Sequence, residues 1–192
     1  MNPETKPNKI SETEIEGLLV VEYPFYSDER GFLQEMFRKN EFEVAGCRFD
    51  TLHTAISYSR PKVLRGIHTE EWYKYVIPLT GKMFAAYVDT RPDSKTFGYV
   101  HTEVFDYTNI ETRHRGVLLP PGVGNSIGVM GNEGVLYLYS NEDYWEKDKA
   151  RGINLYDPDL NIDWPVADPV VSERDQHNPD LRDLYPHKFK NK

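Results

Sequence analysis

Short apolar runs alternate with turn residues through the middle of the chain. Between residues 51 and 140, runs rich in Val, Ile, Tyr and Phe are separated by Gly, Pro and Asn. The clearest of them are VLRGIH, KYVIPL, GKMFAAYVD, GVLLP and GVLYLYS. Strands this short, with turn signals at regular spacing, are typical of an all-β sandwich or barrel. We therefore predict an all-β fold, built as a jelly-roll β-barrel.

The segment before this region is more polar. Residues 1–14 are polar and contain proline, which predicts a flexible N-terminal arm before a first strand near Gly17 to Pro24. Asn40 is a candidate N-cap for a short helix over residues 41–46, EFEVAG. This is the one helix that the local sequence supports, so we expect one or a few short helices in all.

The segment after Tyr144 is charged and carries the run DPDLNIDWP, which predicts extended chain and turns lying against the barrel. At 192 residues and 22.4 kDa, the chain has the usual size of a single domain with one core. We assign residues 15–178 to that domain and residues 179–192 to a C-terminal tail.

Composition and charge exclude several classes of partner. Aromatic residues make up 13% of the chain and include 13 tyrosines, so burial can rest on large rings. The formal net charge of -8 argues against nucleic acid and against an anionic membrane, because both require clustered Lys and Arg. A local pocket of basic side chains can still hold the phosphates of a small molecule.

The number of cysteines and the composition of the N-terminus indicate the cellular compartment. Cys47 is the single cysteine and cannot form an internal disulfide. The first residues lack the apolar run of a signal peptide, and no stretch approaches membrane-spanning length. We therefore expect a cytoplasmic protein.

One of the six histidines has a setting that favours chemistry. A lone histidine is more often a surface or core residue, and this interpretation fits His101, His114, His177 and His187. His68, however, ends the strand-like run 63–68, where strict alternation would place Arg65 and His68 on opposite faces. A bulge at Gly66 would aim this cation and this titratable ring into one pocket.

Tyrosines and carboxylates are harder to assign from pattern alone. Tyr139 shares a strand face with Val135 and Tyr137, and the pattern does not choose between the two tyrosines. Asp175 is one of 31 acidic residues and would ordinarily lie on a solvated surface. Either residue needs a specific interacting side chain before it can be assigned a role in catalysis.

Several motifs nevertheless occur together in a fixed order. They are DERGF at 28–32, LRGIH at 64–68, VDTRPDS at 88–94 with TFG at 96–98, LPPG at 119–122, LY at 138–139, DPDL at 157–160 with IDWP at 162–165, and SERD at 172–175. In this order and spacing, over roughly residues 17–177, they resemble the dTDP-4-dehydrorhamnose 3,5-epimerase family.

The resemblance implies a fold and a reaction. The family has a cupin-like jelly roll, usually as a homodimer, and it moves protons at the carbons flanking the C4 ketone of a nucleotide-diphosphate sugar. It uses no metal or redox cofactor. A C–H bond beside a ketone is only weakly acidic, so the reaction needs a base, a donor or cation at the enolate oxygen, and an acid on the opposite face of the ring.

Four positions match the family's proton-transfer residues. His68 falls where the family has its base, and Asp175 where a carboxylate orients that imidazole and stabilises its charge. Lys74 matches the lysine near the ketone oxygen, and Tyr139 matches the tyrosine that returns a proton. Inversion follows if the base and the tyrosine lie on opposite faces of the sugar.

Four further positions match substrate contacts. Arg30 and Arg65 match arginines that reach the diphosphate or the sugar. Glu35 matches an acidic residue at the cleft, and Tyr144 matches an aromatic residue near the bound sugar nucleotide. Because the family exchanges N-terminal strands between subunits, Arg30 is a candidate for the neighbouring subunit's site.

The chain also departs from the family at pocket positions. Asn125 stands where a histidine is common, and His53 and Ala55 stand where glutamine and asparagine are common. The loop of residues 69–73 is shorter than usual. These features are similar to those of relatives that act on GDP-linked 4-keto heptoses. They predict an altered substrate, or epimerisation narrowed to one carbon.

Three other functions remain open at this point. A metal-dependent cupin would share the fold, and His68 and Glu70 are two potential ligands, but Asn125 replaces the third. A non-catalytic sugar-nucleotide binding module would not need a base and an opposed acid. A 3,4-ketoisomerase would use a similar histidine and would differ in where the product carbonyl appears.

Overall fold

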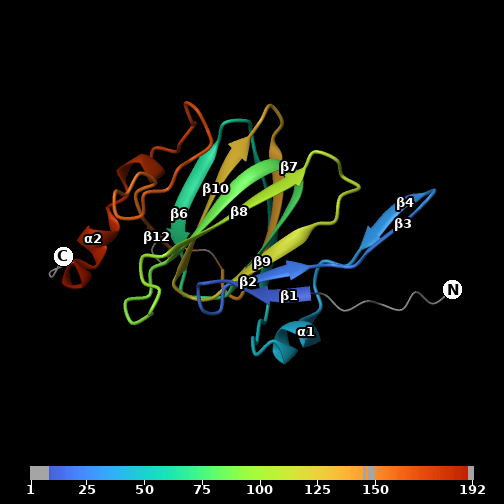
Figure 1. Cartoon of the computed structure of the whole chain (residues 1–192), viewed down its shortest axis with the longest axis horizontal. Helices are drawn as coiled ribbons and strands as arrows, with labels where there is room; N and C mark the ends of the chain where they lie inside the picture. The colour runs from blue at the N-terminus through green and yellow to red at the C-terminus, as the bar shows by residue number, and fades with distance from the viewer. Residues whose placement is uncertain (1–8, 145, 147–149, 190–192) are drawn as a thin grey trace.

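Strands account for most of the ordered elements in the computed structural model, which describes residues 9–144, 146 and 150–189 (Figure 1). The strands are β1 (Lys9–Glu12), β2 (Leu19–Glu22), β3 (Phe25–Asp28), β4 (Gly31–Gln34), β5 (His53–Ser59), β6 (Leu64–Thr69), β7 (Lys74–Asp89), β8 (Val100–Tyr107), β9 (Arg115–Leu119), β10 (Val123–Met130), β11 (Val135–Asn141) and β12 (Arg151–Gly152). The helices are α1 (Lys39–Val44) and α2 (Leu181–Leu184), with the 3₁₀ turns η1 (Asp175–His177) and η2 (Pro186–Lys188).

The strands form two antiparallel sheets that share β7. The first half of this long strand pairs with β9 and β11, in a sheet ordered β1-β2-β9-β7-β11-β5. The second half pairs with β8 and β10, in a sheet ordered β12-β6-β10-β7-β8. β7 changes partners at Gly81, whose φ is +77° and where a Cβ atom would collide with the carbonyl of Gly134. The all-β jelly roll is thereby confirmed.

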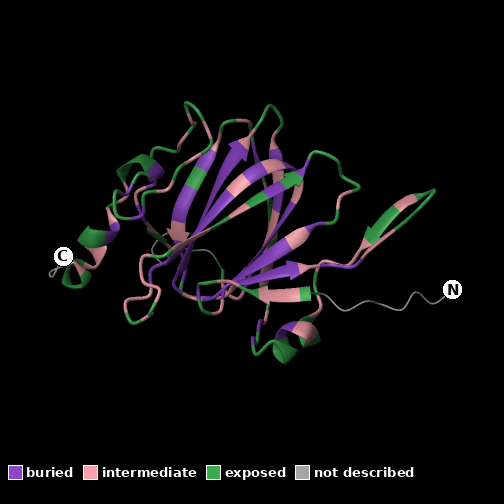
Figure 2. Ribbon diagram, in the orientation of Figure 1, coloured by how far each residue is buried: buried purple, intermediate pink, exposed green. Residues whose placement is uncertain are grey.

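The main core lies between the two sheets, because β7 is apolar along most of its length. Val76 from its first half and Met83, Ala85 and Tyr87 from its second half are fully buried in one cluster. This cluster also takes side chains from β10 and β11. Figure 2 shows the buried residues concentrated in these central strands. The expectation that rings would supply much of the burial is confirmed by Tyr87 and by seven other aromatic residues that are at most 4% exposed: Tyr23, Phe42, Phe49, Tyr75, Phe105, Tyr107 and Tyr137.

Two segments outside the predicted domain pack against it. Residues 9–12 belong to the predicted arm but form β1, which pairs with β2, whereas residues 1–8 lie outside the described part. Leu181 belongs to the predicted tail but is fully buried beside Leu64 and Ile67. Ordered packing therefore extends further toward both ends than the polar composition predicts. None of the helices in the described residues is long and apolar enough to cross a membrane.

The prediction that Asn40 caps α1 is wrong. The helix begins at Lys39, so Asn40 lies inside it, and Arg38 takes the cap position with extended backbone and no capping side chain. Arg38 instead donates through its guanidinium to Glu41 at 3.2 Å, in the first turn, and also to Glu35. These ion pairs hold the helix start in place of a polar cap.

A two-stranded hairpin stands apart from both sheets. β3 and β4 pair with each other and with no other strand among the described residues. The hairpin projects from the side of the barrel and is largely exposed at its tip (Figures 1 and 2). Its apolar side chains Phe32 and Leu33 are 38% and 63% exposed.

Candidate active site

A cavity of about 280 Å³ receives side chains from both sheets. Its described lining residues are Ser57, Arg65, His68, Glu70, Trp72, Lys74, Asn125, Ser126, Ile127, Tyr137, Tyr139, Asn141 and Arg174. Most of them come from β6, β10 and β11, whereas β5 and β7 contribute one each, the short loop that joins β6 to β7 contributes two, and Arg174 precedes η1. The cavity is therefore built on rigid strands rather than on long loops.

A β-bulge aims Arg65 and His68 into this cavity together. Asn125 of β10 pairs with His68 and Ile127 pairs with Arg65, so two residues of β6 oppose Ser126 alone. Gly66 lies in the bulge with a φ of +125°, and a Cβ atom there would collide with Ser126. The predicted bulge is confirmed, and it explains why a glycine separates the two polar residues.

The imidazole of His68 is bound to a buried carboxylate. Its Nε2 lies 2.7 Å from Oδ1 of Asp175, which is 4% exposed and begins η1. The second oxygen of Asp175 accepts the backbone N–H of Gly66 at 3.4 Å. Nδ1 of the ring has no protein partner in the part of the chain that the structure describes. One ring nitrogen is thus oriented by the protein and the other can exchange a proton.

The same contacts keep Asp175 ionised. Burial by itself raises the pKa of the Asp175 carboxyl, but the hydrogen bond and the charge of His68 act in the opposite direction. Contacts from Gly66 and Ser172 add to them, so the pKa of Asp175 lies below its usual value. A carboxylate held against an imidazole in this way suits the pair to proton transfer with a ligand.

Lys74 opens β7 and places its ammonium group at the wall of the cavity. Its Nζ donates to Oε1 of Glu70 at 2.9 Å and lies 5.4 Å from the centre of the Tyr139 ring. The side chains of Lys74 and Glu70 are 12% and 7% exposed. A cation held in a setting with so little water interacts strongly with any charge that develops nearby.

Tyr137 and Tyr139 lie two positions apart on β11, on the same face of the strand, and both line the cavity. Tyr137 is buried, and its hydroxyl donates to Oδ1 of Asn125 at 3.5 Å. Burial raises the pKa of Tyr137, and the contact with Asn125 offsets this only in part. Tyr139 is half-buried, with its ring against Lys74. The two tyrosines, which pattern alone does not separate, therefore have different environments.

Two predicted contact residues flank the cavity rather than line it. The ring of His53 lies 6.3 Å from that of Tyr139 and 6.0 Å from that of Tyr144. Tyr144 is 60% exposed. Arg65 and Asn125 do line the cavity, and Nε of Arg65 donates to the hydroxyl of Ser59 at 2.9 Å.

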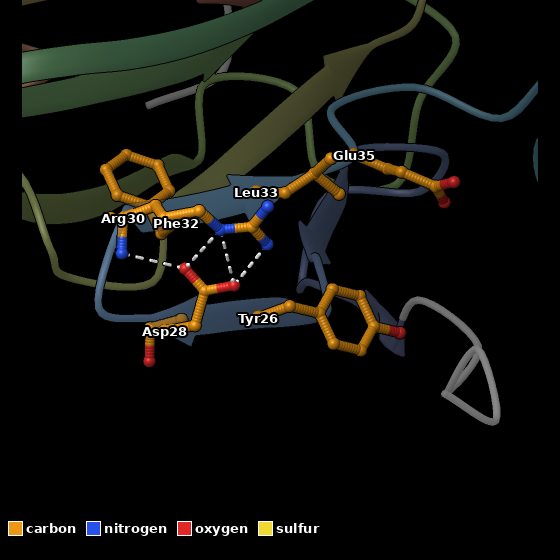
Figure 3. Close-up of a pocket in the computed structure, with 8 residues that line it drawn as sticks. Tyr26, Asp28, Arg30, Phe32, Leu33 and Glu35 are labelled. Atoms are coloured by element: carbon orange, nitrogen blue, oxygen red, sulfur yellow. Dashed lines mark hydrogen bonds and ion pairs between the residues drawn. The ribbon is translucent and has the colours of Figure 1, made fainter. Parts of the chain in front are cut away.

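Arg30 and Glu35 lie elsewhere in the single chain. They line a second cavity, of about 460 Å³, along the β3–β4 hairpin (Figure 3). Arg30 is paired there with Asp28, and Glu35 is paired with Arg38. One copy of the chain therefore does not bring these two predicted residues to His68, because the hairpin projects away from the barrel.

The described residues contain no group of three or more His, Cys, Asp or Glu side chains placed to hold a metal ion. His68 and Glu70 share the cavity with Asn125, whose amide takes the place of a third ligand of those types.

The sequence matches a family model along most of its length. The model of dTDP-4-dehydrorhamnose 3,5-epimerase matches residues 12–183. The chain belongs to this family. It is accordingly an isomerase-class enzyme that epimerises a nucleotide-linked 4-keto sugar.

Individual members of the epimerase family are similar over nearly the whole chain. An RmlC homolog from Streptococcus pyogenes serotype M6 is 38% identical, covering 92% of this chain and 91% of its own. The dTDP-4-dehydrorhamnose 3,5-epimerase of Shigella flexneri is 33% identical, covering 86% and 92%. The crystal structure of dTDP-6-deoxy-D-glucose-3,5-epimerase RmlC from Legionella pneumophila Philadelphia 1, in complex with dTDP-4-keto-L-rhamnose, superposes with a TM-score of 0.85 at 29% identity, covering 95% and 97%.

Several lining residues of this epimerase were not predicted as site residues. Asn141 lies two positions after Tyr139 on the same face of β11, so strand periodicity alone could have predicted it as a lining residue. Arg174 adjoins Asp175 in a motif of the family, which was a weaker signal. Glu70 was considered only as a metal ligand, and Trp72 lies in the short loop, where no periodicity applies.

Proposed function

We propose that this epimerase inverts C3, C5 or both of a nucleotide-diphosphate 4-keto sugar, with His68 as its base. The observation that carries the proposal is the 2.7 Å contact between His68 and buried Asp175 at the wall of a cavity that also contains Lys74 and Tyr139. A base, an oriented carboxylate, a cation and a phenol are the groups that proton transfer beside a ketone requires.

The proposed steps assign one role to each of these groups. His68 takes the proton from the carbon beside the C4 ketone, and the electron pair of the broken C–H bond forms the enolate. The ammonium of Lys74 stabilises the charge on the enolate oxygen. Tyr139 then donates its phenolic proton to the opposite face of the same carbon, which inverts it. Proton exchange with solvent restores both His68 and Tyr139, so the sugar is isomerised with no net gain or loss of atoms.

The relatives support a nucleotide diphosphate as the carrier of the sugar. The Legionella enzyme binds dTDP-4-keto-L-rhamnose, and the family description names a dTDP-linked sugar. The cavity of this chain differs at Asn125 and beside it at His53, where the family commonly has other polar groups. We therefore propose a sugar with a different hydroxyl arrangement, and GDP-linked 4-keto heptoses remain the predicted alternative.

Deuterium uptake tests the proposed function. When the protein is incubated in deuterated water with 4-keto sugars linked to TDP, GDP, CDP or UDP, we expect deuterium at C3, C5 or both for one of them. The physical reason is that the base exchanges its proton with solvent between abstraction and return. NMR of the recovered sugar identifies the carbon and the preferred nucleotide in the same experiment.

The same experiment separates the rival functions. A carbonyl that has moved to C3 would identify a 3,4-ketoisomerase, and binding without exchange at any carbon would indicate a binding module. Exchange is expected to continue after treatment with EDTA. Loss of exchange with EDTA, restored by one metal ion, would favour the metal-dependent cupin.

We further propose that the protein acts as a homodimer in which Arg30 serves the partner's cavity. The β3–β4 hairpin pairs with no other described strand of its own chain, and it carries exposed apolar side chains. Arg30 is 83% exposed at its side chain, which leaves it available to a ligand bound elsewhere. A projecting hairpin of this kind suits exchange between two copies.

Mixed dimers test this arrangement. Arg30→Ala and His68→Asn should each inactivate a dimer of identical chains, but co-expression with two tags yields mixed dimers with one intact site. A random mixture is expected to recover about a quarter of wild-type activity, because half of the dimers have one of two sites intact. If the purified mixed dimer were as inactive as its parents, Arg30 would act within its own chain.

A further inference from the structure

Glu70 is a buried carboxylate that the proposed reaction leaves without a role. It lies on the short loop after β6 and is 6% exposed. Its backbone carbonyl accepts the N–H of Gly122 at 2.9 Å, which fixes the loop against the turn before β10. Its side chain binds Lys74 at 2.9 Å. Both ends of the residue are therefore held in place.

The charges around the cavity make Glu70 distinctive. Arg65, Lys74 and Arg174 bring three cationic side chains to the lining. Among the described lining residues Glu70 is the single carboxylate, because Asp175 lies behind His68. Without Glu70, the described lining would contain three cationic side chains and no carboxylate, and the largely buried ammonium of Lys74 would lose its paired charge.

A buried ion pair of this kind contributes little to stability on its own. Removing two charges from water costs about as much as their attraction returns, so an apolar pair of the same volume would often serve a fold as well. Lysine also has a flexible four-carbon stem, which leaves its ammonium poorly fixed unless it has a partner. The face of the Tyr139 ring, 5.4 Å from Nζ, provides a weak second contact. The ion pair with Glu70 is the stronger of these two contacts.

We propose that Glu70 is a positioning residue that fixes the ammonium of Lys74 at the carbonyl oxygen of the substrate. This inference rests on the proposed function, because it assigns Lys74 to the enolate oxygen. Glu70 does not touch the reacting carbon. It acts through Lys74, so its removal should reduce the rate of enolate formation more than the binding of the substrate.

The first test replaces Glu70 with glutamine, which keeps the shape and removes the charge. We expect kcat for deuterium exchange to fall about 10- to 100-fold, while KM changes less than about threefold. Glu71→Gln is the matched control, since Glu71 is the next residue, is 63% exposed at its side chain and lies 3.7 Å from Arg151. This control should keep wild-type kcat. Wild-type kcat in Glu70→Gln, or a change confined to KM, would overturn the inference.

A double-mutant cycle with Lys74→Met distinguishes positioning from a general structural effect. If Glu70 acts through Lys74, Glu70→Gln should cost nothing further once Lys74 is methionine. An equal loss in both backgrounds would overturn the inference. If Glu70→Gln does not fold, Glu70→Asp keeps the charge but withdraws it by one methylene, and should give a smaller loss of the same kind; wild-type kcat in Glu70→Asp would count against a positioning role.

The wild-type protein separates this inference from the function it rests on. Exchange by the wild type with an unaffected Glu70→Gln variant would overturn the role of Glu70 alone. Absence of exchange in the wild type with every 4-keto sugar would overturn the proposed function and this inference together.

Discussion

Replacing His68 with asparagine should reduce deuterium exchange at every carbon of the sugar by about a hundredfold to ten-thousandfold. A positioned general base contributes about 10²- to 10⁴-fold, and among the described lining residues His68 is the one histidine, held by buried Asp175 at 2.7 Å. The bulge itself depends on Gly66 against Ser126 and not on the imidazole, so its geometry should survive the substitution. The measurement is NMR of the sugar after incubation in deuterated water.

His101→Asn serves as the control for His68→Asn. His101 lies on β8, where its ring is paired with Glu14 and Glu103, and it does not line the cavity. It should retain wild-type exchange. If His68→Asn retained full exchange at either carbon while the protein remained folded, the assignment of the base would be wrong.

Replacing Tyr139 with phenylalanine should separate exchange from inversion. Without the phenol, His68 still removes the proton and returns a deuteron to the same face, so exchange continues. Delivery from the opposite face should fall about a hundredfold, because its acid is missing. The expected product is labelled sugar with its original configuration, and NMR coupling constants of the ring protons report that configuration.

Tyr137→Phe is the companion variant for this experiment. Tyr137 shares the strand face with Tyr139, but it is buried, and its hydroxyl is directed to Asn125. Burial raises the pKa of Tyr137, which makes its phenol a poor proton donor. If inversion depended on Tyr137 and not on Tyr139, the two roles would have to be exchanged.

The strand pattern predicted the barrel and the bulge for a common physical reason. Apolar runs of fixed period and a glycine between Arg65 and His68 are local features, and local sterics determine their geometry. The contact of His68 with Asp175 joins residues separated by 107 positions. No local pattern encodes such a contact, and the motif order of the family was what singled out Asp175.

Other features depended on interactions that periodicity does not describe. The start of α1 is held by ion pairs of Arg38 rather than by Asn40, which has the preferred residue type for a cap. Glu70 became significant only when a short loop brought it to Lys74. The family resemblance placed Arg30 among the substrate contacts, but the sequence pattern did not predict that Arg30 lies on a hairpin separate from both sheets.

The sharing of β7 between the two sheets determines how the cavity can respond to a ligand. Lys74 begins this strand in one sheet, whereas His68 belongs to a strand of the other sheet. The continuous backbone of β7 prevents the two walls from separating as independent bodies, so domain closure is not available to this enzyme. The catalytic side chains are therefore already positioned in the folded protein. Binding costs the substrate its own translational and conformational entropy, but it requires little rearrangement of the protein.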